Sequence, residues 1–360
     1  MDPHGPIAKR FPLVARFRPA CLPLPERVQA LTELASRAAQ HNDPGLASTV
    51  FNQAALLASD VGLPDLARSM CHRHAQAYLT AGPLPAMSAI RGLEPLINLA
   101  RLQIRAGHPD DARQRLLDLY EAVGTGTPAT FEGITVPADL TRTDEGRREV
   151  HAWLWRVLLA DGTRTLTTTG RWPKALAHIE RHHGIGTRML DGRQVAVIAA
   201  LVEDNPDRAN KLLTNTTLGE SWEQIVTACL TVFCRRDAGQ PMDNHVADLV
   251  NAYLVHEAKP GLTVFDIRLG LTVLDTMGGV DHPEARRLTE SMARRTTDAR
   301  DGYAARELLA HPCTARLTRD SQVQGCRNLA RSCALGTGSL PDGLYADLAA
   351  TLDTAEAALM

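Results

Sequence analysis

The sequence is poor in the residues that β-strands and aromatic cores use. Phe, Trp and Tyr together make up 4% of its 360 residues, whereas hydrophobic residues as a whole make up 44%. Strands favour aromatic and β-branched side chains, while Leu and Ala are strong helix formers. A core built mostly from Leu, Ala and Val therefore favours closely packed helices, and the composition predicts an all-α fold.

The chain also lacks an excess of charge of either sign. Its formal net charge is −2, with 39 basic and 41 acidic residues. Because nucleic-acid binding needs a basic surface, we do not expect a nucleic-acid partner. The one Arg-rich segment, residues 284–301, interleaves its arginines with acidic residues, which is typical of a solvated helix.

Paired cysteine motifs and long hydrophobic runs are absent as well. The seven Cys residues form no Cys-x-x-Cys pair, and most lie in apolar helical patterns, where a free thiol packs as a small hydrophobe. The longest apolar run, residues 195–202, is far shorter than the ~20 residues that a transmembrane helix needs. We therefore expect a cytoplasmic protein with reduced cysteines and no membrane partner.

The sequence contains no residue pattern with the spacing of a known catalytic or cofactor-binding motif. Walker A, Gly-x-Ser-x-Gly, Ser-x-x-Lys and Asp-Asp-x-x-Asp patterns are missing, and the runs 124–126 and 184–186 do not follow strands, as phosphate-binding loops do. His178 and His182 have the spacing at which two helical imidazoles share a metal ion, but no HExxH or Cys-x-x-Cys pattern supplies further ligands. We therefore assign no catalytic residue, no metal site and no cofactor.

What the sequence does contain is a recurring pattern of helix, tight turn and helix, clearest in Pro95–Val123. Proline fits the first turn of a helix, where its missing N–H is not needed, and a small Ala one turn later lets two antiparallel helices approach closely. Apolar residues recur at i, i+3 and i+4 between these turns, and this periodicity predicts roughly 15 helices. The Pro-x-x-Ala unit occurs at Pro44–Ala47, Pro64–Ala67, Pro109–Ala112 and Pro206–Ala209.

These hairpins resemble the tetratricopeptide repeat (TPR). The residues at the spacing of its consensus are Leu99, Ala100, Gly107, Ala112 and Leu116, and, on the same frame, Thr163, Leu166, Gly170, Ala175 and Ile179. The copies are irregular, because Ala47 and Ala67 lie so close that one helix would serve two repeats. The resemblance implies an irregular, TPR-like solenoid of helical hairpins whose concave face holds a peptide, a protein or a small ligand.

We expect four segments along the chain. Residues 1–24 form a proline-rich basic arm, residues 25–123 the N-terminal hairpins, residues 124–148 a Gly/Thr/Pro-rich loop, and residues 149–360 an irregular C-terminal array with a capping helix. Within the loop, residues 130–136 predict a short β-hairpin that turns at Glu-Gly.

The TPR frame also suggests which side chains face a ligand, because such positions lie on the first helix of each hairpin. Trp155 is a further candidate, because Trp153 and Trp155 lie two positions apart on one helix and cannot both face the core. The predicted groove residues are Asn52, Glu94, Arg101, Arg105, Trp155, Arg164, Asp191 and Gln194.

The sequence thus predicts a non-enzymatic scaffold that binds a peptide or partner protein, as a regulatory or accessory factor. Two alternatives stay open. One is a sensor of a small molecule, in which Arg101 and Arg105 would face an anion. The other is an α-helical enzyme that uses the region of His178 and His182. Nothing in the sequence indicates an oligomeric state.

Overall fold

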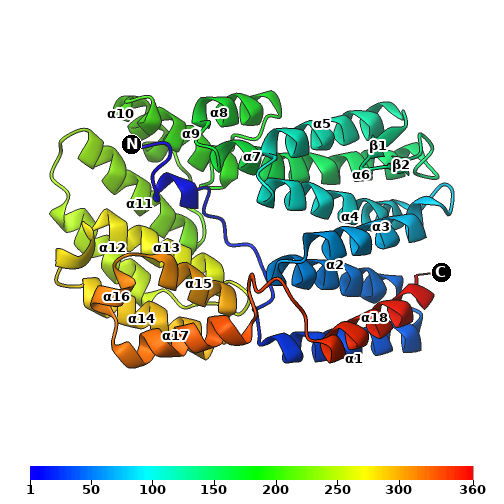
Figure 1. Cartoon of the computed structure of the whole chain (residues 1–360). Helices are drawn as coiled ribbons and strands as arrows, with labels where there is room; N and C mark the ends of the chain where they lie inside the picture. The colour runs from blue at the N-terminus through cyan, green and yellow to red at the C-terminus, as the bar shows by residue number, and fades with distance from the viewer. Residues whose placement is uncertain (360) are drawn as a thin grey trace. The chain divides into compact units, whose positions relative to one another are not determined.

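The computed structural model describes residues 1–359 and consists of α-helices with one very short sheet (Figure 1). It confirms the predicted all-α fold class. The chain forms two compact units: unit 1 contains residues 1–23 and 166–333, and unit 2 contains residues 24–165 and the chain from Ala334 onward. The predicted segments are therefore divided between the units, since residues 149–165 belong with the N-terminal hairpins.

Unit 2 is an array in which each of the first five helices packs against the next. It also includes a π-helical turn at Leu158–Gly162, and α7 (Thr163–Thr167) crosses its boundary. Its elements are α1 (Leu24–His41), α2 (Pro44–Val61), α3 (Pro64–Leu79), α4 (Ala86–Arg105), α5 (Pro109–Thr125), β1 (Ala129–Phe131), β2 (Ile134–Val136), α6 (Asp144–Val157) and α18 (Asp342–Ala357).

Proline and N-cap residues start the helices of unit 2 where the sequence indicates. Helices α2, α3 and α5 each begin with proline, and the side chain of Asp43 accepts hydrogen bonds from two backbone N–H groups of the first turn of α2. The small residues Ala47, Ala67 and Ala112, one turn into these helices, are fully buried. Close helix packing around small residues therefore follows from a local sequence pattern.

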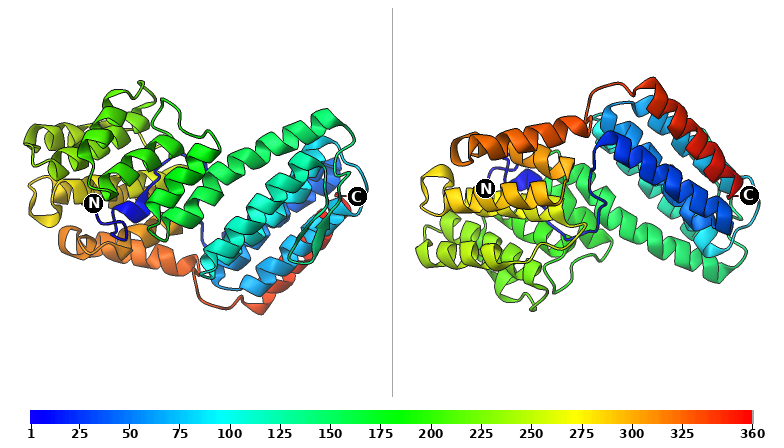
Figure 2. Two further views of the ribbon diagram at one scale, coloured as in Figure 1. Left: turned by 90° about the horizontal axis from the view of Figure 1, so that it is seen from above. Right: turned by 90° about the horizontal axis from the view of Figure 1, so that it is seen from below.

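The last helix of the chain packs against the first. Helix α18 lies beside α1 and also contacts α2 (Figures 1 and 2). The hydroxyl groups of Thr32 and Thr351 are 2.8 Å apart across this pair. Because α18 buries Leu348, Leu352 and Ala355, it covers an apolar face of α1 that would otherwise be exposed.

The short β-hairpin predicted near residues 130–136 is present. Strands β1 and β2 pair antiparallel, with Phe131 opposite Ile134. The two residues between them, Glu132 and Gly133, have φ angles of 46° and 79°, and such positive values are those that a two-residue hairpin turn requires. Phe131 and Ile134 are buried and join the core of unit 2.

Unit 1 has its own apolar core, built from a second run of helices that pack mainly on their neighbours. No helix of the described residues 1–359 is long and apolar enough to cross a bilayer. The helices of unit 1 are α8 (Trp172–Arg181), α9 (Asp191–Val202), α10 (Pro206–Thr214), α11 (Ser221–Asp237), α12 (Asp243–Val255), α13 (Thr263–Thr276), α14 (Ala285–Asp298), α15 (Gly302–Ala310), α16 (Thr314–Leu317) and α17 (Asp320–Ser332), with short 3₁₀ turns at Ala8–Arg10 and Gly279–Asp281.

The N-terminal arm is an ordered part of unit 1. Its apolar residues Ala8, Phe11 and Leu13 are buried in the core of that unit. The guanidinium of Arg10 pairs with Asp275 of α13 at 2.5 Å. The arm is therefore held by both apolar burial and a partly buried ion pair.

Candidate functional site

Four of the predicted groove residues lie together on one face of unit 2. Glu94, Arg101 and Arg105 share a face of α4 with Asn98, because residues three and four positions apart are neighbours on a helix. Asn52 of α2 contacts this face. We call the set Asn52, Glu94, Asn98, Arg101 and Arg105 the polar stripe.

Side-chain hydrogen bonds fix the orientation of the polar stripe. The amide of Asn52 donates from Nδ2 to Glu94 Oε2 at 2.7 Å, and Asn98 Nδ2 donates to Asn52 Oδ1 at 2.9 Å. Arg101 Nη1 donates in turn to Asn98 Oδ1 at 3.1 Å. A primary amide has two N–H donors, so each Asn retains one that no bond between described residues uses.

Asp161 anchors one end of the stripe. Arg101 donates to its two carboxylate oxygens, from Nε at 3.1 Å and from Nη2 at 2.8 Å. Asp161 lies in the π-helical turn, a local irregularity that is frequent at functional sites, and only 10% of its side chain is exposed. The side chain of Arg101 remains 52% exposed, so it is held in place and still partly accessible.

The electrostatics of the stripe are mixed. Burial raises the pKa of Glu94 above its ordinary value, although the Asn52 amide and the nearby arginines oppose this shift. A further hydrogen-bond donor would stabilise the charged form of such a half-buried carboxylate. At the other end, Arg105 donates to the hydroxyl of Ser59 and lies 3.7 Å from Asp60. The stripe thus offers both donors and acceptors to a ligand.

Gln194 and Asp191, also predicted as groove residues, lie in unit 1 and hold the N-terminal arm. The fully buried amide of Gln194 accepts from Leu13 N at 2.6 Å and donates to Leu13 O at 2.7 Å. Asp191 accepts from Arg16 Nη2 at 2.7 Å. Both side chains are therefore occupied by the chain itself.

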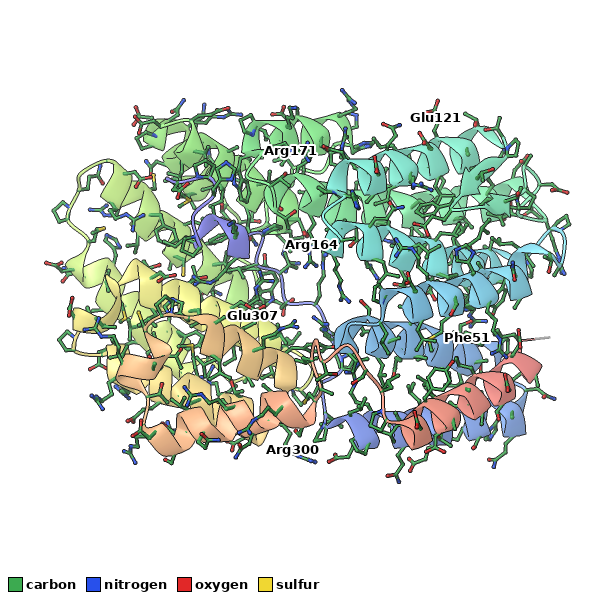
Figure 3. All side chains as sticks on the ribbon, in the orientation of Figure 1. Phe51, Glu121, Arg164, Arg171, Arg300 and Glu307 are labelled. Atoms are coloured by element: carbon green, nitrogen blue, oxygen red, sulfur yellow. The ribbon has the colours of Figure 1, made fainter. Side chains whose placement is uncertain are left out.

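The other predicted positions lie on other helices. Trp155 lies half-buried on α6, and Arg164, labelled in Figure 3, is exposed on α7. His178 is buried, with its ring 4.8 Å from that of His182. Among residues 1–359, no group of three or more His, Cys, Asp or Glu side chains could hold a metal ion.

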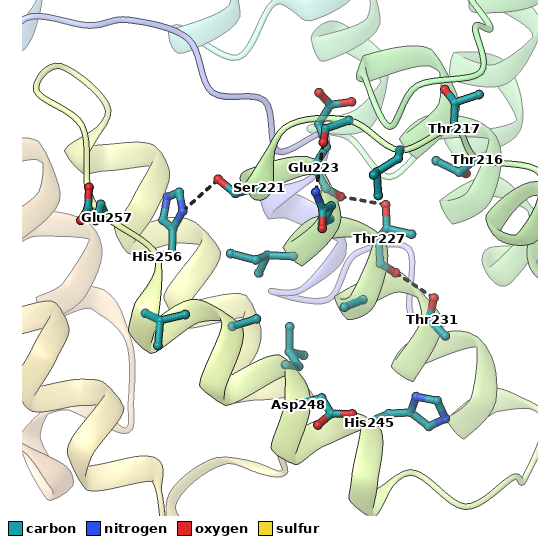
Figure 4. Close-up of a pocket in the computed structure, with 18 of the residues that line it drawn as sticks. Thr216, Thr217, Ser221, Glu223, Thr227, Thr231, His245, Asp248, His256 and Glu257 are labelled. Atoms are coloured by element: carbon teal, nitrogen blue, oxygen red, sulfur yellow. Dashed lines mark hydrogen bonds between the residues drawn. The ribbon is translucent and has the colours of Figure 1, made fainter.

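Sequence reasoning missed a cavity of about 910 Å³ in unit 1, lined chiefly by α11, α12 and the loop before α11 (Figure 4). It contains Ser221 and His256, which are hydrogen-bonded. These residues belong to no spacing motif, and Ser221 carries only the signal of a helix start, so no local pattern could have joined them. Comparison with protein-family models, with curated proteins and with solved structures finds no match to this chain.

Proposed function

We propose that the protein is a TPR-like helical scaffold of the cytoplasm, and that the polar stripe of unit 2 binds a peptide segment of a partner protein without catalysing a reaction. The observation that carries this proposal is the hydrogen-bonded pair Asn52–Asn98, flanked by Glu94 and Arg101. In this role the protein acts as a regulatory or accessory factor.

Amide side chains suit a peptide because their N–H and C=O groups match those of a backbone. Unit 1 provides an example within the same chain, since Gln194 bonds both the N–H and the C=O of Leu13. The free N–H groups of Asn52 and Asn98 support the same kind of contact with carbonyl oxygens of a partner. Recognition of this kind depends on the peptide backbone more than on its sequence.

Preorganisation supports binding at this stripe. Ordering a long side chain on binding costs roughly 0.5–1.5 kcal/mol, and Arg101 is already ordered by Asp161 and Asn98. The Asn pair is likewise fixed by Glu94. A ligand that uses these groups therefore loses little affinity to side-chain ordering.

The test is a selection of peptides from a displayed random library against the full chain, followed by affinity measurements on two double variants. In the first, Asn52→Ala and Asn98→Ala remove both amides of the stripe. In the control, Asn210→Ala and Asn251→Ala remove two exposed amides of unit 1.

A net contribution of about 1 kcal/mol per hydrogen bond predicts that the stripe variant binds the selected peptides roughly 10- to 30-fold more weakly. The control variant should bind like the native protein, and thermal unfolding should show that both variants are folded. Equal binding by the two folded variants, or a library that yields no binder, would refute the proposal.

A further inference from the structure

Two side chains that line the cavity of unit 1, together with a buried carboxylate that contacts one of them, have the arrangement of a hydrolase triad. Ser221 begins α11, His256 follows the last residue of α12, and Asp266 lies in the first turn of α13. Ser221 Oγ is 3.4 Å from His256 Nδ1, as Figure 4 shows, and His256 Nε2 is 3.3 Å from Asp266 Oδ1. We propose that these three residues form a hydrolytic site for carboxylic esters with an apolar acyl group.

The geometry assigns a role to each member. Asp266 Oδ1 accepts a hydrogen bond from His256 Nε2–H, which leaves the Nδ1 lone pair directed at Ser221. Imidazole can act as a base through either nitrogen, and a triad is defined by geometry and roles, whatever its order in the chain. Contacts of 3.3–3.4 Å are long for hydrogen bonds, but catalytic contacts are often loose without substrate.

Asp266 is difficult to explain as a structural residue. It is 0% exposed, and its Oδ2 has no hydrogen-bond partner among the described residues. A buried, half-satisfied carboxylate destabilises the folded state. Orientation of the His256 ring and stabilisation of its charged form account for a carboxylate at this position.

The surrounding contacts hold the triad in place. Tyr253 Oη donates to the carbonyl of Asp266 at 2.9 Å, and Arg295 Nη2 donates to the carbonyl of His256 at 2.8 Å. The residues next to Ser221 and Asp266 also pack together, since the rings of Trp222 and Phe265 meet edge to face at 5.5 Å. Such fixed positions are what a catalytic group needs.

The start of α11 supplies the donors for an oxyanion. The first N–H groups of a helix have no partner within it. The N–H of Glu220 is bonded to Glu223 at 3.1 Å, whereas no hydrogen bond between described residues uses those of Ser221 and Trp222. These two groups lie beside the nucleophile, where the negative oxygen forms. The charge of Glu223 is neutralised by Arg188, with Nε and Oε2 3.2 Å apart.

The cavity wall indicates the substrate class. The hydroxyls of Thr227 and Thr231 donate to backbone carbonyls of their own helix, so these residues do not offer free donors to the cavity. A cavity of about 910 Å³ falls in the size range of small-molecule sites. This wall suits an apolar acyl chain, and its apolar members are Leu218, Ile225, Ala228, Leu249, Ala252 and Val255.

The reaction runs in two balanced steps. In the first, Ser221 Oγ forms a bond to the ester carbonyl carbon while its proton moves to His256 Nδ1, and the carbonyl π pair moves to oxygen. Collapse of this intermediate breaks the bond to the alcohol oxygen, which leaves with the proton from His256. In the second, water gives a proton to His256 and attacks the acyl-serine. Collapse then releases the acid and returns the proton to Ser221.

The test uses the full chain and a fluorophosphonate probe, which phosphonylates activated serines, with p-nitrophenyl butyrate as substrate. We expect one adduct per chain, located on Ser221 by mass spectrometry. Ser221→Ala should abolish both labelling and hydrolysis, whereas Ser332→Ala, which removes another exposed serine, should leave both unchanged.

The general base is tested with His256 and, as a control, with the exposed His108 of unit 2, which does not line the cavity. Loss of a positioned base costs roughly 100-fold or more in rate, so His256→Gln should slow labelling by at least that factor. His108→Gln should not change the labelling rate, because His108 lies outside the cavity.

Asp266 acts through His256 as a positioning residue. Its effect on the tautomer of the His256 ring is measured from the ¹⁵N spectrum of that ring at pH 8. The native protein should show a protonated Nε2 and an unprotonated Nδ1, and Asp266→Ala should shift the ring toward the other tautomer. Labelling that is absent, that falls on a different residue, or that is unchanged in folded His256→Gln would overturn the proposal. A ring tautomer that does not respond to Asp266→Ala would do the same.

Discussion

Because His74 is buried, we expect unit 2 to lose stability in mild acid. This residue of α3 is 1% exposed, its ring stacks on Phe51 at a centroid distance of 5.2 Å, and its Nε2 has no hydrogen-bond partner among the described residues. Figure 3 labels Phe51 on α2. Burial lowers the pKa of His74 from 6.5 to about 3. The His74 ring therefore stays neutral in the folded protein and is readily protonated only when the chain unfolds.

The sign and size of the effect follow from this pKa. A group that binds its proton more weakly when folded gives full stability above pH 6.5, and this stability is lost as pH falls toward 3. At about 1.36 kcal/mol per pH unit, lowering the pH from 7 to 5 removes about 2 kcal/mol. His74→Phe keeps the ring stacking and removes the proton site, so it should abolish this part of the loss.

Hydrogen exchange of the α3 amides at pH 7 and pH 5 measures the loss of stability within unit 2. The native protein should lose about 2 kcal/mol more protection than His74→Phe over this interval. His41→Phe replaces an exposed histidine and should follow the native protein. An identical loss in the native protein and His74→Phe would show that His74 takes up its proton while folded, and would refute the reasoning.

Three further predictions concern packing, the arm and the stripe. Ala112→Trp places a large ring at a fully buried helix crossing and should destabilise unit 2 by about 1–3 kcal/mol in thermal unfolding; an unchanged melting curve would contradict the packing described. Gln194→Ala removes both bonds to Leu13 and should make the arm more sensitive to protease while destabilising unit 1 by about 1–3 kcal/mol. Arg101→Ala with Arg105→Ala should leave unit 2 folded but weaken peptide binding, although the loss of both hydrogen bonds to the nearly buried Asp161 should destabilise the unit by about 1–3 kcal/mol; unaltered affinity would remove both arginines from the site.

Local features of the fold could be predicted from the sequence because their causes are local. Prolines at the first helical position and buried alanines one turn later mark helices such as α2 and α5. The hairpin at Glu132-Gly133 follows from the turn residues alone. The shared face of Glu94, Arg101 and Arg105 likewise follows from helix periodicity, which depends on spacing within one helix.

Long-range pairings could not be predicted in this way. The contact of Gln194 with Leu13 and the packing of α18 on α1 each join segments far apart in the chain, and periodicity does not specify partners. For the same reason, the sequence does not reveal that Ser221, His256 and Asp266 lie close together, since they come from three different elements. The TPR frame predicts Gln194 as a groove residue, whereas in the structure its amide bonds Leu13 of the chain's own arm.

The most direct test of the proposed function is a scan of the backbone carbonyl groups of one selected peptide. Each backbone amide is replaced in turn by a trans-alkene isostere, which removes its carbonyl oxygen, and each side chain is replaced by alanine in a parallel series. If the amides of Asn52 and Asn98 donate to carbonyl oxygens of the peptide backbone, replacement of one or two central amides should weaken binding at least 10-fold in the native protein. The same replacement should have little further effect in the Asn52→Ala, Asn98→Ala variant. Affinity that depends only on side chains, and that responds equally in both proteins, would contradict the account.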